Sequence, residues 1–325
     1  MVEVDKVMAA AESTLQSLEE TRQLFFQKRK KALGIVGIAL GAGAVLGIVL
    51  GFSVSYVLTI ITLVIAGIAS GIVYAVMTGG VKGQYIDSYK STVVEKLVTQ
   101  IDPQLHYYPN DGISRDLFGN SELFTYPDRY RTEDLIKGNY GDTFLYLAEI
   151  HAEEKKERRD KDGKRETYYV DIFKGLMLIA DFHKDFHGRT FVFPDSGEKT
   201  FGGFARFFQK MGGRKGTSLI QLEDVEFEEA FAVHSTDEVE SRYILSSSML
   251  RRFLSMRQRF GSDVRVAFKE SNVIIAVPHK HPYLEPKIKT PATDAKQVRD
   301  MLFEMKYFLD LVEELNLNTR IWTKD

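Results

Sequence analysis

The chain has 325 residues, of which 44% are hydrophobic and 27% charged, with a formal net charge of −2 and no cysteine. A chain of this length can bury the core of one sizeable domain together with attached segments. Without cysteine it has no disulfide, no thiolate nucleophile and no cysteine-ligated zinc. The small net charge gives no bulk attraction to nucleic acid, so no nucleic-acid partner is expected.

The first 31 residues predict an amphipathic helix. Apolar residues recur there at helical intervals, with Glu and Gln between them, at Val4, Val7, Ala11, Leu15, Leu18 and Phe25. Acidic side chains stand where a secretory signal would carry its short basic region. We therefore expect a helix that runs on into the next segment, and no secretory signal at this end.

Residues 32–81 predict a two-helix transmembrane hairpin, because no charged side chain occurs from Ala32 to Val81. As one helix this stretch would be about 75 Å long, whereas the hydrocarbon core of a bilayer is about 30 Å thick. Two spans with a turn near Gly51–Tyr56 fit, since Gly and Ser weaken the helix there. A buried core hairpin of a soluble protein is the alternative interpretation.

Basic residues beside the hairpin predict its orientation. They precede the first span and follow the second, at Lys28, Arg29, Lys30, Lys31, Lys82 and Lys90, and the connecting turn has none. Because Lys and Arg are retained on the cytoplasmic side, both termini are expected in the cytoplasm. The predicted location is the inner membrane of a bacterium, with a multi-pass topology and the lipid bilayer as the first partner.

Glycines at intervals of four predict close helix packing in the membrane. They are Gly37, Gly41, Gly43, Gly47 and Gly51 on the first span and Gly67 and Gly71 on the second. Such spacing lets two helix backbones approach closely in lipid. The packing can lie within the hairpin, and assembly into a homo-oligomer is the alternative.

The remaining sequence predicts a stalk helix over residues 82–102 and an α+β domain over residues 103–325. We expect a mostly antiparallel β-sheet closed by helices, in an order that loosely resembles pleckstrin-like barrels. Strands are expected at residues 144–150, 167–182, 189–194, 218–222, 226–233, 264–269 and 273–278. The charged residues 155–165 are expected to form a loop, with a possible bulge at Gly175. Helices are expected at residues 247–260, ended by Gly261, and 294–315, with Asp294 and Gln297 as a capping pair.

Two stretches of the predicted domain are similar to a known bacterial family. The first runs from Ile172 to Phe182 (IFKGLMLIADF) and continues with Gly188-Arg189-Thr190; the second runs from Phe227 to Val233 and from Glu240 to Leu245. With the two-span anchor, these stretches resemble DUF3137, a family of unknown function. The resemblance implies a bacterial membrane protein, with a LemA-type membrane protein as a possible partner. It implies no activity and no catalytic residue.

One cluster in the sequence has the composition of a metal site. In a strand, Asp181, His183, Asp185 and His187 would share one face, and two imidazoles with two carboxylates can bind a divalent metal. A solvated strand end before Gly188 is the simpler interpretation, so no metal and no cofactor is expected. The turn His279–Pro282 is read as a surface loop.

Aromatic and basic residues between the expected strands predict a surface that faces the membrane or a partner. They are Phe201, Phe204, Arg206, Phe207, Lys210, Arg214 and Lys215. Packing of these rings in the domain core is the alternative. Together the patterns predict a membrane-anchored interaction or scaffold protein without apparent catalytic activity. The alternative function is a membrane-anchored, metal-dependent hydrolase that uses the segment Asp181–His187.

Overall fold

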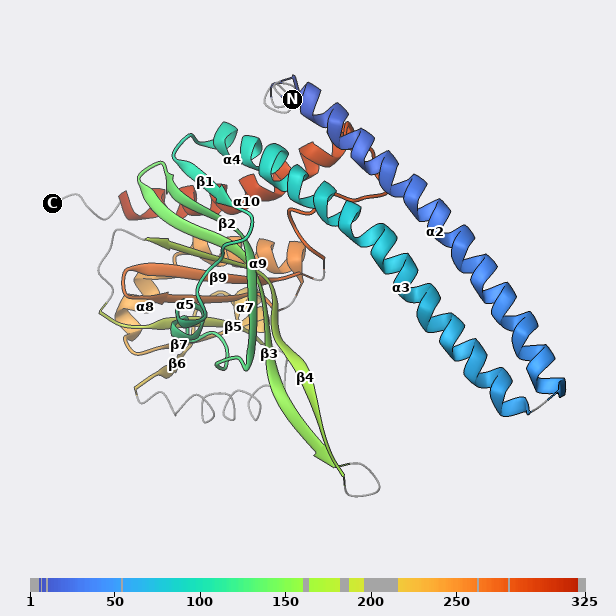
Figure 1. Ribbon diagram of the computed structural model, residues 1–325. Helices are drawn as coiled ribbons and strands as arrows, with labels where there is room; N and C mark the ends of the chain where they lie inside the picture. The colour runs from blue at the N-terminus through green and yellow to red at the C-terminus, as the bar shows by residue number, and fades with distance from the viewer. Residues whose placement is uncertain are drawn as a thin grey trace. The chain divides into compact units, whose positions relative to one another are not determined.

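The computed structural model describes residues 6, 8–9, 11–53, 55–159, 164–181, 187–195, 216–261, 263–279 and 281–320 (Figure 1). The chain divides into two compact units. The helical unit comprises Met1–Leu97 with Glu285–Asp300, and the sheet unit comprises Val98–Leu284 with Met301–Asp325. The expected α+β class, with a helical N-terminal region before an antiparallel sheet, is confirmed.

The helical unit is built on two long antiparallel helices that lie side by side (Figure 1). Helix α2 spans Glu12–Ser53 and α3 spans Tyr56–Tyr89, so the turn falls inside the expected stretch. Ser55 caps α3, because its hydroxyl accepts a hydrogen bond from the backbone N–H of Val57 at 3.3 Å. After Tyr89 the helix continues as a π-helical turn, Lys90–Val94, and as α4, Glu95–Ile101.

Both long helices are long and apolar enough to cross a membrane. Their most apolar windows have a mean hydropathy of 2.4, and only 11% of the window in the first and 6% in the second is buried. Large apolar side chains such as Ile38 and Val76 are each 76% exposed. The core helix of a soluble protein would be mostly buried, so the outer surface of the hairpin resembles that of a membrane span.

A segment near the C-terminal end belongs to the helical unit, which the sequence-based division at residue 103 did not anticipate. The Glu19 carboxylate binds the Arg22 guanidinium at 2.7 Å and accepts a hydrogen bond from the Ala292 backbone N–H at 2.9 Å. Arg22 also donates to the carbonyl of Ile288 at 3.2 Å. The hydrogen bond from Arg22 lowers the pKa of Glu19 to about 2, so this pair stays charged while it ties residues 285–300 to α2.

The sheet unit contains an open antiparallel sheet, in which the described residues form nine strands in the order β1-β2-β3-β4-β9-β8-β5-β7-β6. The strands are β1 Leu105–Tyr108, β2 Arg129–Tyr140, β3 Thr143–Arg159, β4 Arg165–Asp181, β5 Thr190–Pro194, β6 Ser218–Ile220, β7 Phe231–Ser235, β8 Arg265–Lys269 and β9 Asn272–Pro278. Because β1 and β6 stand at opposite edges, the sheet does not close into the pleckstrin-like barrel suggested by the strand order.

Apolar side chains cover both faces of the sheet. On one face, α5 (Arg115–Asn120) and the residues around it supply Phe118 and Phe124, which pack with Phe173 of β4. On the other face, α9 (Ser247–Phe260) brings Phe253 within 6.4 Å of the ring of Phe268. Phe308 of α10 (Ala295–Arg320), in the part of that helix that belongs to the sheet unit, stacks on Phe260 of α9 with ring centroids 5.5 Å apart. Among the described residues the remaining helices are α7 (Val225–Ala230) and α8 (Glu238–Ile244).

Several element boundaries differ from the expectations. Residues 226–233 form helix α7 and then strand β7, because the Asp224 carboxylate accepts a hydrogen bond from the Phe227 N–H at 3.0 Å and caps a helix. The expected loop 155–165 is mostly strand, since β3 and β4 stay paired from Lys155↔Tyr169 to Arg159↔Arg165.

Two local expectations are also corrected. Gln297 does not complete a capping pair with Asp294, because its side-chain oxygen accepts a hydrogen bond from the Lys287 N–H at 2.8 Å. Gly175 is not the bulge: the register passes from Ala152↔Phe173 to Glu153↔Asp171, so the extra residue of β4 is Ile172.

Candidate functional site

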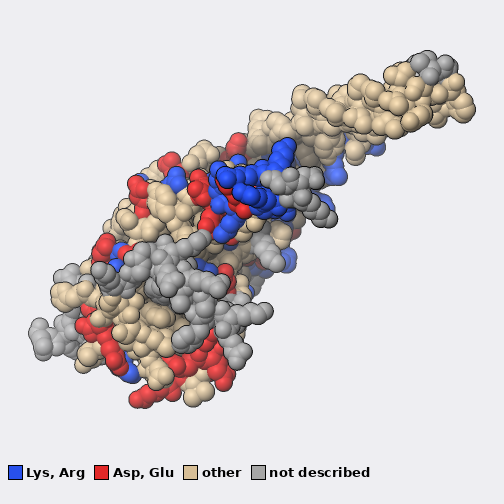
Figure 2. Space-filling model, turned by 90° about the horizontal axis from the view of Figure 1, so that it is seen from below, with Lys and Arg blue, Asp and Glu red and all other residues tan. Residues whose placement is uncertain are grey.

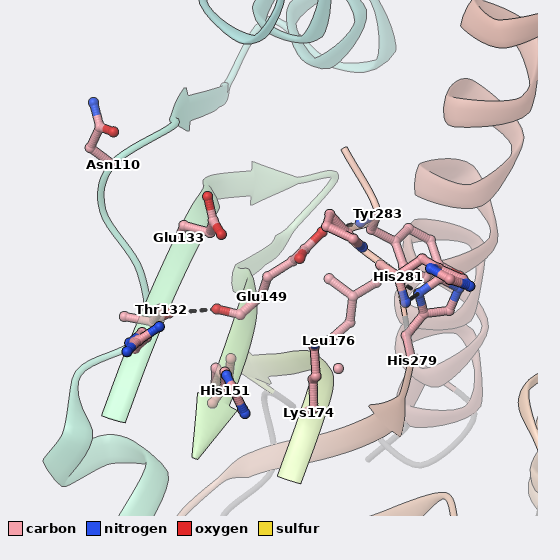
Figure 3. Close-up of a pocket in the computed structure, with 14 residues that line it drawn as sticks. Asn110, Thr132, Glu133, Glu149, His151, Lys174, Leu176, His279, His281 and Tyr283 are labelled. Carbon is pink, nitrogen blue, oxygen red and sulfur yellow. Dashed lines mark hydrogen bonds between the residues drawn. The ribbon is translucent and has the colours of Figure 1, made fainter. Parts of the chain in front are cut away.

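The sheet unit has a cavity of about 410 Å³ above strands β2, β3 and β4 (Figure 3). Its far wall is the segment that follows β9, with His279, His281 and Tyr283. This volume lies in the range of small-molecule pockets, which is roughly 300–1,000 Å³. All of its lining residues belong to the sheet unit, so the cavity is complete within one part of the structure.

The strand register arranges the floor of the cavity in two rows of side chains. Arg131, His151 and Lys174 are paired across β2, β3 and β4 and form a row of cationic and imidazole groups. Glu133 and Glu149 form the next row, two residues along. Since directly paired residues and those two positions away share a face, both charge types reach the same cavity.

Glu149 is the carboxyl group with the most altered acidity in this cavity. One of its oxygens accepts backbone hydrogen bonds from Tyr283 and, at 3.3 Å, from Leu284. Burial raises the pKa of Glu149 to about 7, and the nearby charges of Asp134 and Glu133 act in the same direction. Glu149 therefore changes charge near neutral pH, so the cavity can offer either a carboxylate or a hydrogen-bond donor.

The expected surface turn at residues 279–282 forms a wall of this cavity. The backbone N–H of His279 donates to the carbonyl of Lys174 at 2.9 Å, and the rings of His279 and Tyr283 lie 4.5 Å apart. A Cβ at Gly175 would lie 2.1 Å from the carbonyl oxygen of Val277, so only glycine permits this close approach of β4 and β9. Tyr283 and Leu284, which follow the turn and are buried, are the sequence signal that could have indicated this packing.

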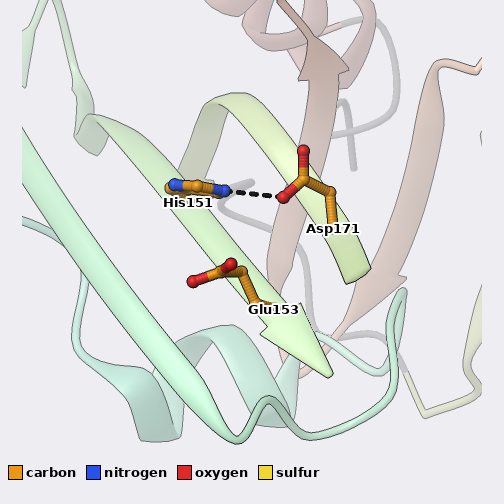
Figure 4. A group of neighbouring side chains, drawn as sticks. All are labelled: His151, Glu153 and Asp171. Atoms are coloured by element: carbon orange, nitrogen blue, oxygen red, sulfur yellow. Dashed lines mark hydrogen bonds and ion pairs between the residues drawn. The ribbon is translucent and has the colours of Figure 1, made fainter. Parts of the chain in front are cut away.

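A second group of side chains lies beside the cavity, on strands β3 and β4 (Figure 4). His151 Nε2 and an Asp171 carboxylate oxygen are 2.7 Å apart. With Glu153 they form a group whose potential ligand atoms all lie within 4.8 Å of one another. The sequence analysis did not find this group, because its members are separated by as many as twenty residues along the chain.

The predicted metal cluster is only partly described. Asp181 is the last residue of β4, and His187 is exposed after it, whereas His183 and Asp185 lie outside the described residues. The whole predicted membrane-facing or partner-facing surface, from Phe201 to Lys215, also lies outside the described residues.

The glycines of the two long helices occupy two kinds of environment. A Cβ at Gly43 would lie 2.7 Å from Cβ of Ala66, and the Thr59 hydroxyl donates to the Gly47 carbonyl at 2.6 Å. Gly51 also faces Thr59. By contrast, a Cβ at Gly37, Gly41, Gly67 or Gly71 would meet no atom within 4 Å.

Comparison with known proteins agrees with the resemblance seen in the sequence. The chain matches the family described as "Protein of unknown function (DUF3137)" over residues 171–317. A similar solved structure is the crystal structure of the mycobacterial trehalose monomycolate transport factor A, TtfA, with 6% identity and a TM-score of 0.32, over 64% of this chain and 86% of that chain. No curated protein matches the chain. The matched residues 171–317 run from within β4 to within α10, and over this range the chain is similar to the DUF3137 family.

Proposed function

We propose that the protein is a membrane-anchored interaction protein of the bacterial inner membrane, with its sheet unit in the cytoplasm. The exposed apolar surfaces of α2 and α3 support the anchor. Basic residues flank the two helices on the same side, and the turn between them has none, which supports two cytoplasmic ends. A protein held in this way is concentrated near other membrane proteins, so a weak contact would suffice for a complex.

The observation that carries the interaction role is the ribbon, which we define as residues 155–159 of β3 paired with residues 165–169 of β4. β2 pairs with β3 only as far as Glu153, and β9 pairs with β4 only from Gly175 onward. Within the described structure, no other strand pairs with the ribbon, which projects from the sheet (Figure 1). Free strand edges are templates for a strand of another chain.

The side chains of the ribbon and its base suit a protein partner. Tyr168 and Val170 lie on one face of β4 and are each 42% exposed. Lys and Arg side chains gather around the ribbon (Figure 2). Some are paired, such as Lys156 with Glu154 and Arg158 with Glu166, each at 2.7 Å. Charged side chains on a free edge also limit unspecific strand pairing, so the ribbon favours a selected partner over self-aggregation.

The partner we propose is a second protein of the same membrane, and the family resemblance suggests a LemA-type protein. To test this, a photo-crosslinking residue would replace Tyr168 in the full chain in bacterial membranes. The crosslinked protein would be identified. The amount of it that copurifies would then be compared between the wild type and a double variant, Tyr168→Ser with Val170→Ser, which we call the ribbon variant. The control is Val225→Ser with Val239→Ser, because these valines are 71% and 66% exposed on other elements.

We expect the ribbon variant to lose at least about 90% of the copurifying membrane protein and the control variant to retain it. This loss corresponds to removal of an apolar contact worth roughly 1.4 kcal/mol or more. Retention of the partner by the ribbon variant would contradict the proposal. A crosslink to a second copy of the chain would also contradict it, because the ribbon would then mediate assembly of a homo-oligomer.

A further inference from the structure

The group His151, Glu153 and Asp171 has the chemistry of a divalent-metal site that the sequence analysis did not anticipate. It combines one imidazole and two carboxylates, which are ligands of Zn²⁺ and Mn²⁺. Their potential ligand atoms already lie within 4.8 Å of one another on rigid, paired strands. Sites on strands hold ligand geometry better than sites on loops.

The bulge in β4 is what brings Asp171 to this face of the sheet. Phe173 is buried in the core on the opposite face, and Ile172 packs against the same core cluster. Two consecutive side chains of β4 therefore point to the core, which is possible only because Ile172 is an extra residue in the register. In a regular strand, alternation from Lys174 would turn Asp171 toward the core and away from His151.

The spacing between the imidazole and the carboxylate fits insertion of a metal with a small adjustment. His151 Nε2 and the Asp171 oxygen are 2.7 Å apart, the distance of a hydrogen bond. Two tetrahedral ligands at the Zn–N and Zn–O distances of protein sites lie about 3.3 Å apart. The Asp171 side chain is 59% exposed, so it can move by the required amount of about 0.6 Å without disturbing the core.

The surroundings determine the kind of metal site. His151 also lines the cavity, so water or a small ligand in the cavity has access to a further coordination position. Arg131 and Lys174 stand directly across from His151 on the neighbouring strands and weaken the binding of a cation. We therefore expect an open site of moderate affinity rather than a closed structural site.

We propose that His151, Glu153 and Asp171 bind one Zn²⁺ or Mn²⁺ ion at the edge of the cavity. This inference goes beyond the proposed interaction function and does not depend on it. It also departs from the expectation of a protein without metal, and it uses residues other than Asp181–His187.

The test is metal uptake by the full chain in lipid nanodiscs. After treatment with a chelator, the protein would be dialysed against Zn²⁺ and separately against Mn²⁺, and the bound metal would be measured by elemental analysis across a concentration series. We expect about one equivalent per chain, and at least about a tenfold weaker affinity in His151→Gln, Asp171→Asn and Glu153→Gln.

Two matched controls separate this site from general charge effects. Glu154→Gln removes the next carboxylate of β3, which points to the other face, and His106→Gln removes an exposed histidine of β1. Both should bind metal like the wild type, and all five variants should unfold at the wild-type temperature without metal. The proposal is overturned if the wild type binds no stoichiometric metal. It is equally overturned if the three site variants bind like the wild type, because the ligands then lie elsewhere, for example at His183 and His187.

Discussion

Single residues on β3 decide the chemistry of the cavity. Glu149 stands between the acidic residue Glu133 on β2 and the apolar residue Leu176 on β4, and its carboxyl group is held by backbone N–H groups of the segment after β9. Burial outweighs these hydrogen bonds and raises its pKa to about 7. Two residues farther along β3, the imidazole of His151 is within hydrogen-bonding distance of the Asp171 carboxylate. Neutral and charged forms of the cavity are therefore both accessible near pH 7.

The raised pKa of Glu149 predicts a pH dependence of stability. The folded chain keeps the proton of Glu149 up to about pH 7, whereas an unfolded glutamate loses it near its ordinary value of 4.5. The stabilising contribution of this group is therefore complete below pH 4.5 and is lost as the pH rises through 7. Relative to Glu149→Gln, we expect the wild type to lose on the order of 2 kcal/mol between pH 4.5 and pH 8.

Calorimetric unfolding of the full chain at a series of pH values would measure this difference. Glu157→Gln, which removes an exposed carboxyl group of β3 outside the cavity, is the control and should keep the wild-type pH dependence. If Glu149→Gln and the wild type lose stability in parallel between these pH values, Glu149 does not titrate near neutrality.

Helices α2 and α3 pack against each other through the face of α2 that carries Gly43, Gly47 and Gly51. The contacts with Ala66 and Thr59 show that small residues let the two backbones approach closely, a kind of packing that is common between helices in membranes. The neighbouring Gly37 and Gly41 have open space around them. These two faces of one helix provide a matched comparison.

We expect Gly43→Leu to destabilise the hairpin by about 1–3 kcal/mol, because its first side-chain atom would already lie too close to Ala66. Gly41→Leu should have little effect, since it extends into open space. Thermal unfolding in nanodiscs, followed by circular dichroism, would show a lower midpoint for Gly43→Leu alone. Equal midpoints for the two variants would mean that the helices do not pack through this face.

The sequence was informative where a pattern is local. The helical spacing before Gly261 and the apolar run of β9 predicted α9 and β9 closely. β2 was missed because the bulge between Glu133 and Ile136, where Asp134 has φ 60°, interrupts its alternation. The cavity and the group at His151 could not be predicted, because they depend on the register at Ile172 and on contacts between residues more than a hundred positions apart.

The proposed topology requires that the hairpin inserts with both of its ends on one side of the membrane. Phe52 lies at the end of α2, next to the turn between the helices, and is 91% exposed, while Lys156 is on the ribbon of the sheet unit. A cysteine introduced at either position would be the single thiol of the chain, because the sequence has no cysteine. Thiol labelling of a cysteine introduced at each position can therefore report the location of the hairpin turn and of the sheet unit.

The most direct test is labelling of Phe52→Cys and Lys156→Cys by a membrane-impermeant maleimide in spheroplasts, before and after permeabilisation of the membrane. We expect Phe52→Cys to be labelled in intact spheroplasts, and Lys156→Cys to be labelled only after permeabilisation. Recovery of both variants with the membrane fraction, after extraction at high pH, is part of the expected result. Labelling of Lys156→Cys in intact spheroplasts, or release of the protein by the extraction, would contradict a cytoplasmic sheet unit anchored by a two-helix hairpin.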